Sequence, residues 1–222
     1  MRGIEERRFL RVGHGGASGV VRGNTLASFD AALDLGIDLI EFDVRAWQGR
    51  LVLAHTMFHA RWASCVSLER ALAHLAHPRF ADVGLNADVK HVGCEAALLD
   101  VLRRRNLVRR TLVSSQVRAV LDRVRALDPS VRTGMSVGGA VARRSRRWRD
   151  WRAEVLEDLR RERYDALMAY HRLVDARLVD DVRERCGAVF AWTIKDAAAL
   201  TPLRAAAVDG VVTVDPRLLL GS

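Results

Sequence analysis

Short apolar runs alternate with amphipathic segments along almost the whole chain. In the segments between the runs, apolar residues recur three or four positions apart, as in Leu26, Phe29 and Leu33, which is the spacing of an amphipathic helix. The runs that have the length and composition of buried strands are residues 9–14, 37–44, 84–89, 111–115, 130–135, 164–170, 188–194 and 209–214. Strands that alternate with helices in this way predict a parallel sheet covered by helices.

This number of strand–helix units predicts a (β/α)8 TIM barrel of the α/β class. The alternative is a doubly wound open sheet, but no glycine-rich phosphate loop follows an early strand, which disfavours it. Because no linker and no internal repeat interrupts the pattern, we predict a single barrel domain over residues 1–222, short and with little or no inserted subdomain. For the first helix we expect Asn24 as the N-cap and Gly36 just beyond the C-terminus.

Acidic side chains lie where the second and third predicted strands end. Glu41 and Asp43 are two residues apart and therefore point to the same face of the strand, and Asp88 stands near the end of the next strand. The carboxyl ends of barrel strands line the active site, so the three carboxylates are expected to converge. Such a set of hard oxygen ligands suits one divalent ion, Mg²⁺ or Ca²⁺. The alternative is that these acids pair with arginine inside the barrel.

Basic side chains accompany these acids. His14 closes the first predicted strand and His55 follows a short apolar run, so together they can form an acid–base pair in which one ring removes a proton and the other donates one. The alternative is that one of them is a structural histidine at the rim. Lys90, one of only two lysines in the chain, follows Asp88 by two residues and is expected to neutralise charge on a phosphoryl oxygen.

Charge and cysteine content narrow the class of protein. Lys and Arg number 36 against 27 Asp and Glu, a net charge of +9, which is compatible with phosphate esters, lipid head groups or nucleic acid as partners. Cys65, Cys94 and Cys186 form no CxxC pair, so neither a disulfide framework nor a zinc site is expected. With no apolar signal-peptide core and no apolar stretch of membrane-spanning length, the sequence predicts a cytoplasmic protein.

One strongly basic segment, residues 143–152, holds six arginines and two tryptophans. In a barrel its start belongs to the active-site face, where arginine beside tryptophan suits contact with an anionic membrane surface. Nucleic acid is a less favoured partner, because it leaves the acids at the strand ends without a role. The alternative is a solvated helix start whose tryptophans pack inward.

Several short motifs occur in an order that resembles the glycerophosphodiester phosphodiesterase family. They are GHGGAS (13–18), GNTLASFDAALDLGIDLIEFDV (23–44), LVLAH (51–55), LNADVK (85–90), AWTIKD (191–196) and VDGVVTVDP (208–216). Together they cover nearly the whole chain. The resemblance implies a (β/α)8 barrel that hydrolyses glycerophosphodiesters or lysophospholipid-type substrates with the help of a metal ion.

The resemblance also implies roles for individual residues. His14 and His55 take the catalytic positions, and Lys90 faces the phosphate. The metal ligands are Glu41, Asp43 and Asp88. Trp192 lines the substrate pocket, although a tryptophan on an inward-facing strand position can equally be ordinary core packing.

This chain departs from the family pattern at several positions. Gly15 and Gly23 replace the usual Arg and Glu, and Arg22 is the candidate to supply the missing positive charge to the substrate. Asp88 replaces a Glu, and Thr56 an Asp. The segment 56–86 is short, so we expect a more open pocket. The alternative to an enzyme is a catalytically weakened barrel that binds an anionic, phosphate-containing ligand without turnover.

Overall fold

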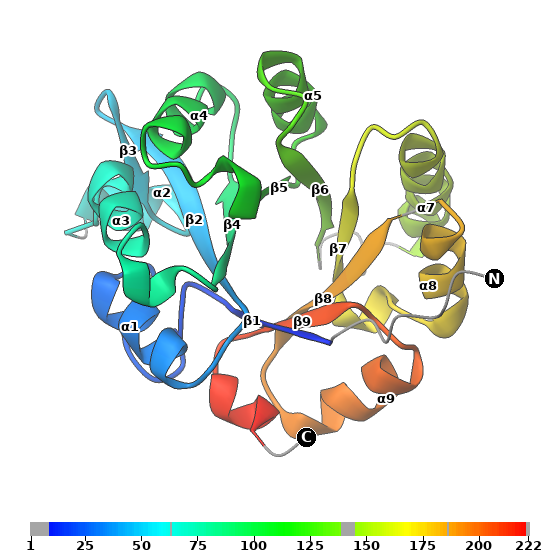
Figure 1. The fold of residues 1–222 in the computed structure, drawn as a ribbon. Coiled ribbons are helices and arrows are strands. Elements are labelled where there is room, and N and C mark those ends of the chain that lie inside the picture. The colour runs from blue at the N-terminus through cyan, green and yellow to red at the C-terminus, as the bar shows by residue number, and fades with distance from the viewer. Residues whose placement is uncertain (1–8, 63, 139–144, 186, 221–222) are drawn as a thin grey trace.

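Eight parallel strands close into a barrel with the helices outside it (Figure 1). The computed structural model describes residues 9–62, 64–138, 145–185 and 187–220. The parallel strands are β1 (Leu10–Gly13), β2 (Leu39–Trp47), β4 (Gly84–Val89), β5 (Thr111–Ser115), β6 (Arg132–Val137), β7 (Ala166–Tyr170), β8 (Ala188–Ile194) and β9 (Gly210–Thr213). Strand β1 pairs with both β2 and β9, so the eight parallel strands form a closed barrel and the open-sheet alternative is wrong. The predicted barrel is confirmed, with each predicted run forming one strand.

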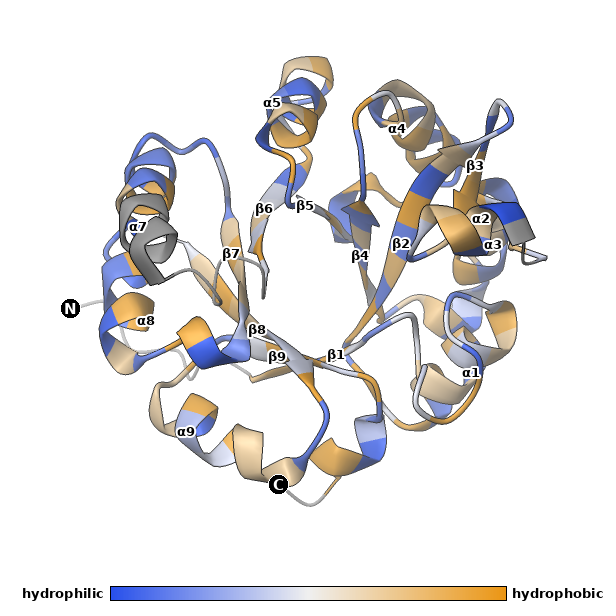
Figure 2. Ribbon diagram, turned by 180° about the vertical axis from the view of Figure 1, so that it is seen from behind, coloured by the Kyte–Doolittle hydropathy of each residue, from blue (hydrophilic) through white to orange (hydrophobic). Residues whose placement is uncertain are grey.

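The helices follow the strands in turn and cover the outside of the sheet. In the described part of the chain they are α1 (Leu26–Asp34), α2 (Met57–Trp62), α3 (Leu68–Leu75), α4 (Glu95–Arg104), α5 (Arg118–Leu127), α7 (Ser145–Arg160), α8 (Ala176–Arg183) and α9 (Leu200–Ala205). Colouring by hydropathy shows apolar residues concentrated along the strands and on the helix sides facing them (Figure 2). Burial of this stripe, rather than helix propensity, holds the short helices in place.

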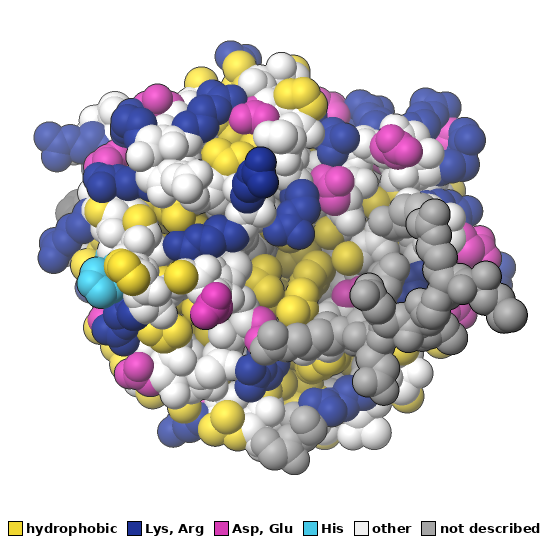
Figure 3. All heavy atoms as spheres, viewed as in Figure 1, with side chains coloured by type: hydrophobic (Ala, Val, Ile, Leu, Met, Phe, Trp, Pro, Cys, Tyr) yellow, Lys and Arg dark blue, Asp and Glu magenta, His cyan; other side chains and the backbone are white. Residues whose placement is uncertain are grey.

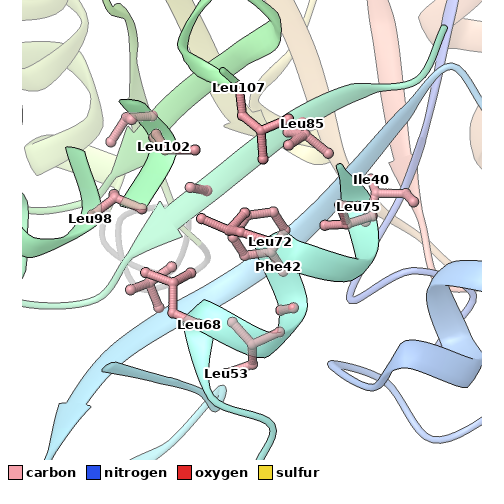
Figure 4. Packing of buried hydrophobic residues seen from close by; sticks show 14 of the residues in the cluster. Ile40, Phe42, Leu53, Leu68, Leu72, Leu75, Leu85, Leu98, Leu102 and Leu107 are labelled. Carbon is pink, nitrogen blue, oxygen red and sulfur yellow. The ribbon is translucent and has the colours of Figure 1, made fainter. Parts of the chain in front are cut away.

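Alternation along β2 separates the core from the site. Ile40, Phe42 and Val44 are fully buried and pack outward against the helices, in the cluster that includes Leu72 and Leu98 (Figure 4). Successive side chains of a strand point to opposite faces, so Glu41 and Asp43 must face the barrel interior. The large outward burial therefore stabilises a strand that carries two acids inward.

Strand β2 is longer than predicted and continues into a hairpin. Its last residues pair antiparallel with β3 (Arg50–Leu53), with Val44 opposite Leu53 and Trp47 opposite Arg50. Gly49 in the turn has φ +74°, a conformation that glycine adopts without steric cost. The hairpin returns the chain toward the barrel mouth, and this places His55 beside β2.

The start of helix α1 differs from the prediction. Thr25, not Asn24, is the N-cap: its hydroxyl accepts from the Ser28 amide at 3.2 Å, and the Ser28 hydroxyl accepts from the Thr25 amide at 3.2 Å. Asn24 lies one residue earlier with φ +57° and turns its amide toward β2. The expectation for Gly36 is confirmed, because it follows the C-cap Leu35 with φ +69°.

The outer surface is mixed in charge. On the face seen in Figure 3, Lys and Arg side chains are spread around a central hollow with hydrophobic side chains, and Asp and Glu side chains lie among them. The positive excess is therefore dispersed over this face rather than gathered into one patch. None of the helices in the described residues is both long and apolar enough to cross a membrane.

Candidate active site

Three carboxylates converge at the carboxyl ends of β2 and β4, as predicted. Asp43 and Asp88 are direct partners in the register of these neighbouring strands, and Glu41 points to the same side as Asp43. One oxygen from each lies within 4.8 Å of the others. Glu41 and Asp43 are buried, with 4% and 0% of their surface exposed. A buried cluster of like charges is costly unless cations neutralise it.

Lys90 supplies one such cation. Its Nζ lies 2.5 Å from Asp43 Oδ1 and also contacts Asp88 Oδ2. Burial alone would lower the pKa of Lys90, but the charges of Asp88 and Asp43 outweigh burial and raise it, so the ammonium is charged. In the described part of the chain, the acids thus pair with this lysine rather than with arginine, contrary to the arginine alternative.

Asp43 is held by contacts on several sides. Asn24 Nδ2 donates to Asp43 Oδ2 at 2.7 Å, and His55 Nδ1 lies 3.2 Å from Oδ1. Burial on its own raises the pKa of Asp43, but the His55 hydrogen bond and the charge of Lys90 dominate and lower it. Asp43 is therefore ionised and fixed in position, as a metal ligand must be.

The pKa of Glu41 is shifted in the opposite direction to that of Asp43. Its Oε2 accepts from the Gly15 amide at 2.8 Å, yet burial, reinforced by the charge of Asp43, raises its pKa well above the usual range. Asp88 Oδ1 is buried without a hydrogen-bond partner in the described structure. A raised carboxyl pKa and an unpartnered carboxylate oxygen both indicate that the positive charge of Lys90 does not fully balance the three carboxyl groups. The donor set consists of hard oxygens and fits Mg²⁺ or Ca²⁺.

The two candidate catalytic histidines lie together beside the carboxylates. The rings of His14 and His55 are 6.0 Å apart between centroids and inclined by 57°. The His55 side chain is 55% exposed, whereas His14 is largely enclosed, and burial lowers the pKa of His14. The pair spans the boundary between the buried cluster and solvent, where a proton can be passed to or from a bound molecule.

Two cavities meet at this pair. The first, of about 290 Å³, extends over the barrel mouth and is lined by Glu41, Asp88 and Lys90, with Trp192 in its wall. Trp192 Nε1 donates to the Met168 carbonyl at 2.9 Å, so its ring is fixed along the cavity. The tryptophan is therefore a wall residue of the cavity, as the resemblance implies.

The second cavity, of about 310 Å³, lies on the other side of the histidines. Its lining includes Gly15, Arg22, Gly23, Asn24 and Asp43. Both cavities border His14, His55 and Val214. The predicted site residues are thus brought together, but Arg22 and Trp192 lie in different cavities.

Sequence reasoning missed some residues that the structure places at the site. Asn24 binds Asp43, whereas capping preferences assigned it to α1. Gln116 and Lys195 line the first cavity just beyond the ends of β5 and β8. They stand at the carboxyl ends of predicted strands, as His14 does, and this position could have identified them.

One departure from the family pattern, Thr56, has a local structural explanation. Thr56, where the family carries an acid, accepts from the His59 amide at 3.1 Å within the turn that begins α2.

In the basic segment 143–152, Arg143 and Arg144 lie outside the described residues. Arg152 is described and pairs with Asp181 at 2.8 Å, so at least this arginine supports packing between α7 and α8.

Proteins that are similar to this chain in sequence are named as phosphodiesterases. The family model described as "Glycerophosphoryl diester phosphodiesterase family" matches residues 14–61 and 85–218. A glycerophosphodiester phosphodiesterase of Caldanaerobacter subterraneus subsp. tengcongensis is 24% identical over 244 residues, covering 95% of this chain and 96% of the relative.

Solved structures show the same fold. The crystal structure of a putative glycerophosphoryl diester phosphodiesterase from Silicibacter pomeroyi matches with a TM-score of 0.81 at 19% identity, over 97% of this chain and 94% of that one. An Oleispira antarctica phosphodiesterase, solved in complex with the product sn-glycerol-3-phosphate, matches with a TM-score of 0.76 at 23% identity, over 94% of each chain.

These matches, added to the barrel and its cluster of acids and histidines, define the class of protein: it is a phosphoric diester hydrolase. Because the family model covers most of the chain, the protein belongs to the glycerophosphoryl diester phosphodiesterase family. Between its two matched parts the family model leaves residues 62–84 unmatched, and these lie within the segment 56–86.

Proposed function

We propose that this enzyme hydrolyses glycerophosphodiesters or lysophospholipid-type esters with one divalent cation, Mg²⁺ or Ca²⁺, held by Glu41, Asp43 and Asp88. The observation that carries the proposal is the convergence of these three carboxylates within 4.8 Å, next to the paired rings of His14 and His55. When bound, the cation would polarise a phosphoryl oxygen and stabilise the charge that develops in the transition state.

The two histidines divide the proton transfers. Burial lowers the pKa of His14 and so favours its neutral ring, which suits it to remove a proton from water or from a neighbouring substrate hydroxyl. His55 is more exposed and is oriented by Asp43, so it is placed to protonate the departing alcohol. Because one ring removes a proton and the other donates one, one ring must hold a proton at the start of the reaction while the other does not.

The other residues bind and orient the substrate. Lys90 keeps the acidic cluster compact and offers its ammonium to a phosphoryl oxygen once substrate arrives. Trp192 gives the alcohol in the first cavity an aromatic wall. Arg22, in the second cavity, supplies positive charge near the position where the family has an arginine and this chain has Gly15.

Hydrolysis assays test this function directly. The purified protein is incubated with glycerophosphocholine, glycerophosphoethanolamine and a lysophospholipid, in the presence of Mg²⁺, Ca²⁺ or excess EDTA. We expect release of glycerol phosphate or of the free alcohol with at least one cation, and its loss in EDTA. Equal rates with and without EDTA would contradict the metal role. Absence of hydrolysis with every cation, alongside measurable binding, would favour the non-catalytic alternative.

We also propose that the basic segment 143–152 brings the enzyme to anionic lipid surfaces. Its sequence composition supports this, since clustered arginines are attracted to anionic head groups and tryptophan favours the membrane interface. In the sequence, the segment follows β6 and includes the first residues of α7. The carboxyl end of β6 lies on the side of the barrel where the cavities open.

A further inference from the structure

The second cavity borders both positions at which this chain lacks a family side chain. Gly15 and Gly23 stand where the resemblance places an arginine and a glutamate, and both line this cavity. Two long side chains are therefore absent from one confined place. The space of about 310 Å³ borders both His14 and His55.

The backbone around this cavity is built for glycine. A Cβ on Gly23 would come within 2.6 Å of Ser18 Cβ, which is closer than real contacts allow. Gly15 has φ +57°, and a Cβ there would meet the Asn24 amide nitrogen at 3.2 Å. The local structure therefore favours glycine at both positions, and the two glycines leave space in the lining of the second cavity.

The position of the cavity relates it to the reaction. A phosphodiester carries two alcohols on one phosphorus, and the first and second cavities meet at His14 and His55. With the phosphoryl group at the histidines, one alcohol extends into each cavity. The first cavity has the aromatic wall of Trp192, and the second has small polar residues and Arg22.

The charge of the second cavity comes mainly from Arg22. Asp43 is the acid in its lining, and it is fully buried and already contacted by Lys90, His55 and Asn24. Arg22 Nη2 has a long contact, 3.5 Å, to the Ser64 carbonyl. Across the residues that the structure describes, Arg22 has no carboxylate within ion-pair distance, so its charge is available to a ligand.

We propose, building on the phosphodiesterase function above, that the second cavity binds the second alcohol of the phosphodiester and that Arg22 selects alcohols bearing an anionic group. A carboxylate and a phosphate both fit this description, because each accepts charge-assisted hydrogen bonds from a guanidinium. The favoured substrates are thus glycerophosphodiesters whose second alcohol is itself negatively charged.

Two matched substrate pairs test the proposal. Glycerophosphoserine differs from glycerophosphoethanolamine by one carboxylate, and glycerophosphoinositol 4-phosphate differs from glycerophosphoinositol by one phosphate. For the wild-type enzyme we expect kcat/KM to be about tenfold higher for the anionic member of at least one pair, as a charge-assisted hydrogen bond provides. The pair that shows the preference identifies carboxylate or phosphate as the group recognised.

Variants locate the preference in the molecule. Arg22→Gln is expected to bring the ratio of kcat/KM within a pair to about 1–2, and Arg22→Lys to retain part of it. Lys195→Gln removes one of the two lysines that line the first cavity, and Arg50→Gln removes an exposed charge on the β2–β3 hairpin. Both are expected to leave the ratio as in the wild type. A ratio of one in the wild type, or loss of the preference in Lys195→Gln rather than Arg22→Gln, would overturn the proposal.

Failure of the proposed function has a different signature. If none of the four compounds is hydrolysed, the phosphodiesterase assignment to these substrates fails, and calorimetric binding of the same compounds decides the cavity proposal separately. Binding about tenfold tighter for the anionic member, lost in Arg22→Gln, supports it. Equal dissociation constants within both pairs contradict it.

Discussion

Asn24 and Asp43 bind each other through two hydrogen bonds that run in opposite directions. The Asn24 side-chain amide donates to Asp43 Oδ2 at 2.7 Å, and the Asp43 backbone amide donates to Asn24 Oδ1 at 3.0 Å. One amide therefore fixes both the strand backbone and the carboxylate of a candidate metal ligand. Partners of this kind orient ligands and tune metal affinity.

Removing this amide should weaken metal binding. Asn24→Gly keeps the backbone at φ +57° unstrained while deleting the side chain, so any loss comes from the lost hydrogen bonds. We expect the metal concentration for half-maximal hydrolysis to rise about 10- to 100-fold. Asn106→Gly is the matched control, because Asn106 also has positive φ, +55°, and follows α4 away from the site. A similar metal dependence in both variants would refute the role of Asn24.

The paired histidines should be individually essential for turnover. His14→Ala and His55→Ala are each expected to lower kcat by at least ~10²-fold, the usual contribution of a general acid or base. The measurement is steady-state hydrolysis, with folding checked by circular dichroism. His91→Ala is the control, because His91 accepts from the Ala46 amide at 3.1 Å and lines neither cavity. Unchanged kcat in either active-site variant would show that the ring takes no part in proton transfer.

The carboxyl group of Glu41 is expected to lower the free energy of unfolding of the metal-free protein at neutral pH. Burial raises the folded-state pKa of Glu41 above its unfolded value, so its carboxyl contributes fully below the unfolded pKa. That contribution is lost as pH rises through the folded pKa. In EDTA, Glu41→Gln is therefore expected to be more stable than wild type at pH 7–8, by on the order of 1 kcal/mol.

Urea denaturation at several pH values measures this difference. The advantage of Glu41→Gln should shrink toward pH 4, where the wild-type carboxyl is protonated in both states. Added Mg²⁺ or Ca²⁺ should stabilise only the wild type, because the variant lacks one of three carboxylates. A variant that is less stable than wild type at every pH would contradict the electrostatic explanation, because the glutamine oxygen can still accept from the Gly15 amide.

The basic segment should matter only at a lipid surface. We expect Arg143, Arg144, Arg146 and Arg147 changed together to Ser to lower hydrolysis of a lysophospholipid in anionic vesicles by about tenfold or more, because each arginine near the surface contributes about 1 kcal/mol of attraction. Activity on a water-soluble glycerophosphodiester serves as the control and should follow the wild type. Identical activity of the variant on anionic vesicles would rule out the membrane role.

Local pattern was enough to predict that three carboxylates converge at one end of the barrel. Glu41, Asp43 and Asp88 were assigned to one cluster because strands have a period of two and the carboxyl ends of barrel strands share one face. His14 was placed by the same rule. The local pattern failed at the start of α1: Asn24 is a residue type that favours the N-cap, but the N-cap is Thr25, one position later. The preference of a residue type for helix starts does not show whether that residue binds a distant strand instead, as Asn24 binds Asp43 on β2.

By itself, the sequence determined the order of strands and helices, the inward direction of the acids and the membership of a family, because each depends on periodicity or on short motifs. Only the tertiary structure decided that Lys90 bridges Asp43 and Asp88, that Asn24 reaches Asp43 across 19 residues, and that two cavities meet at the histidines. These contacts arise when the sheet closes and brings together loops that are distant in the chain. Their geometry depends on backbone angles and on the space left by neighbours such as Gly15, which no local pattern specifies.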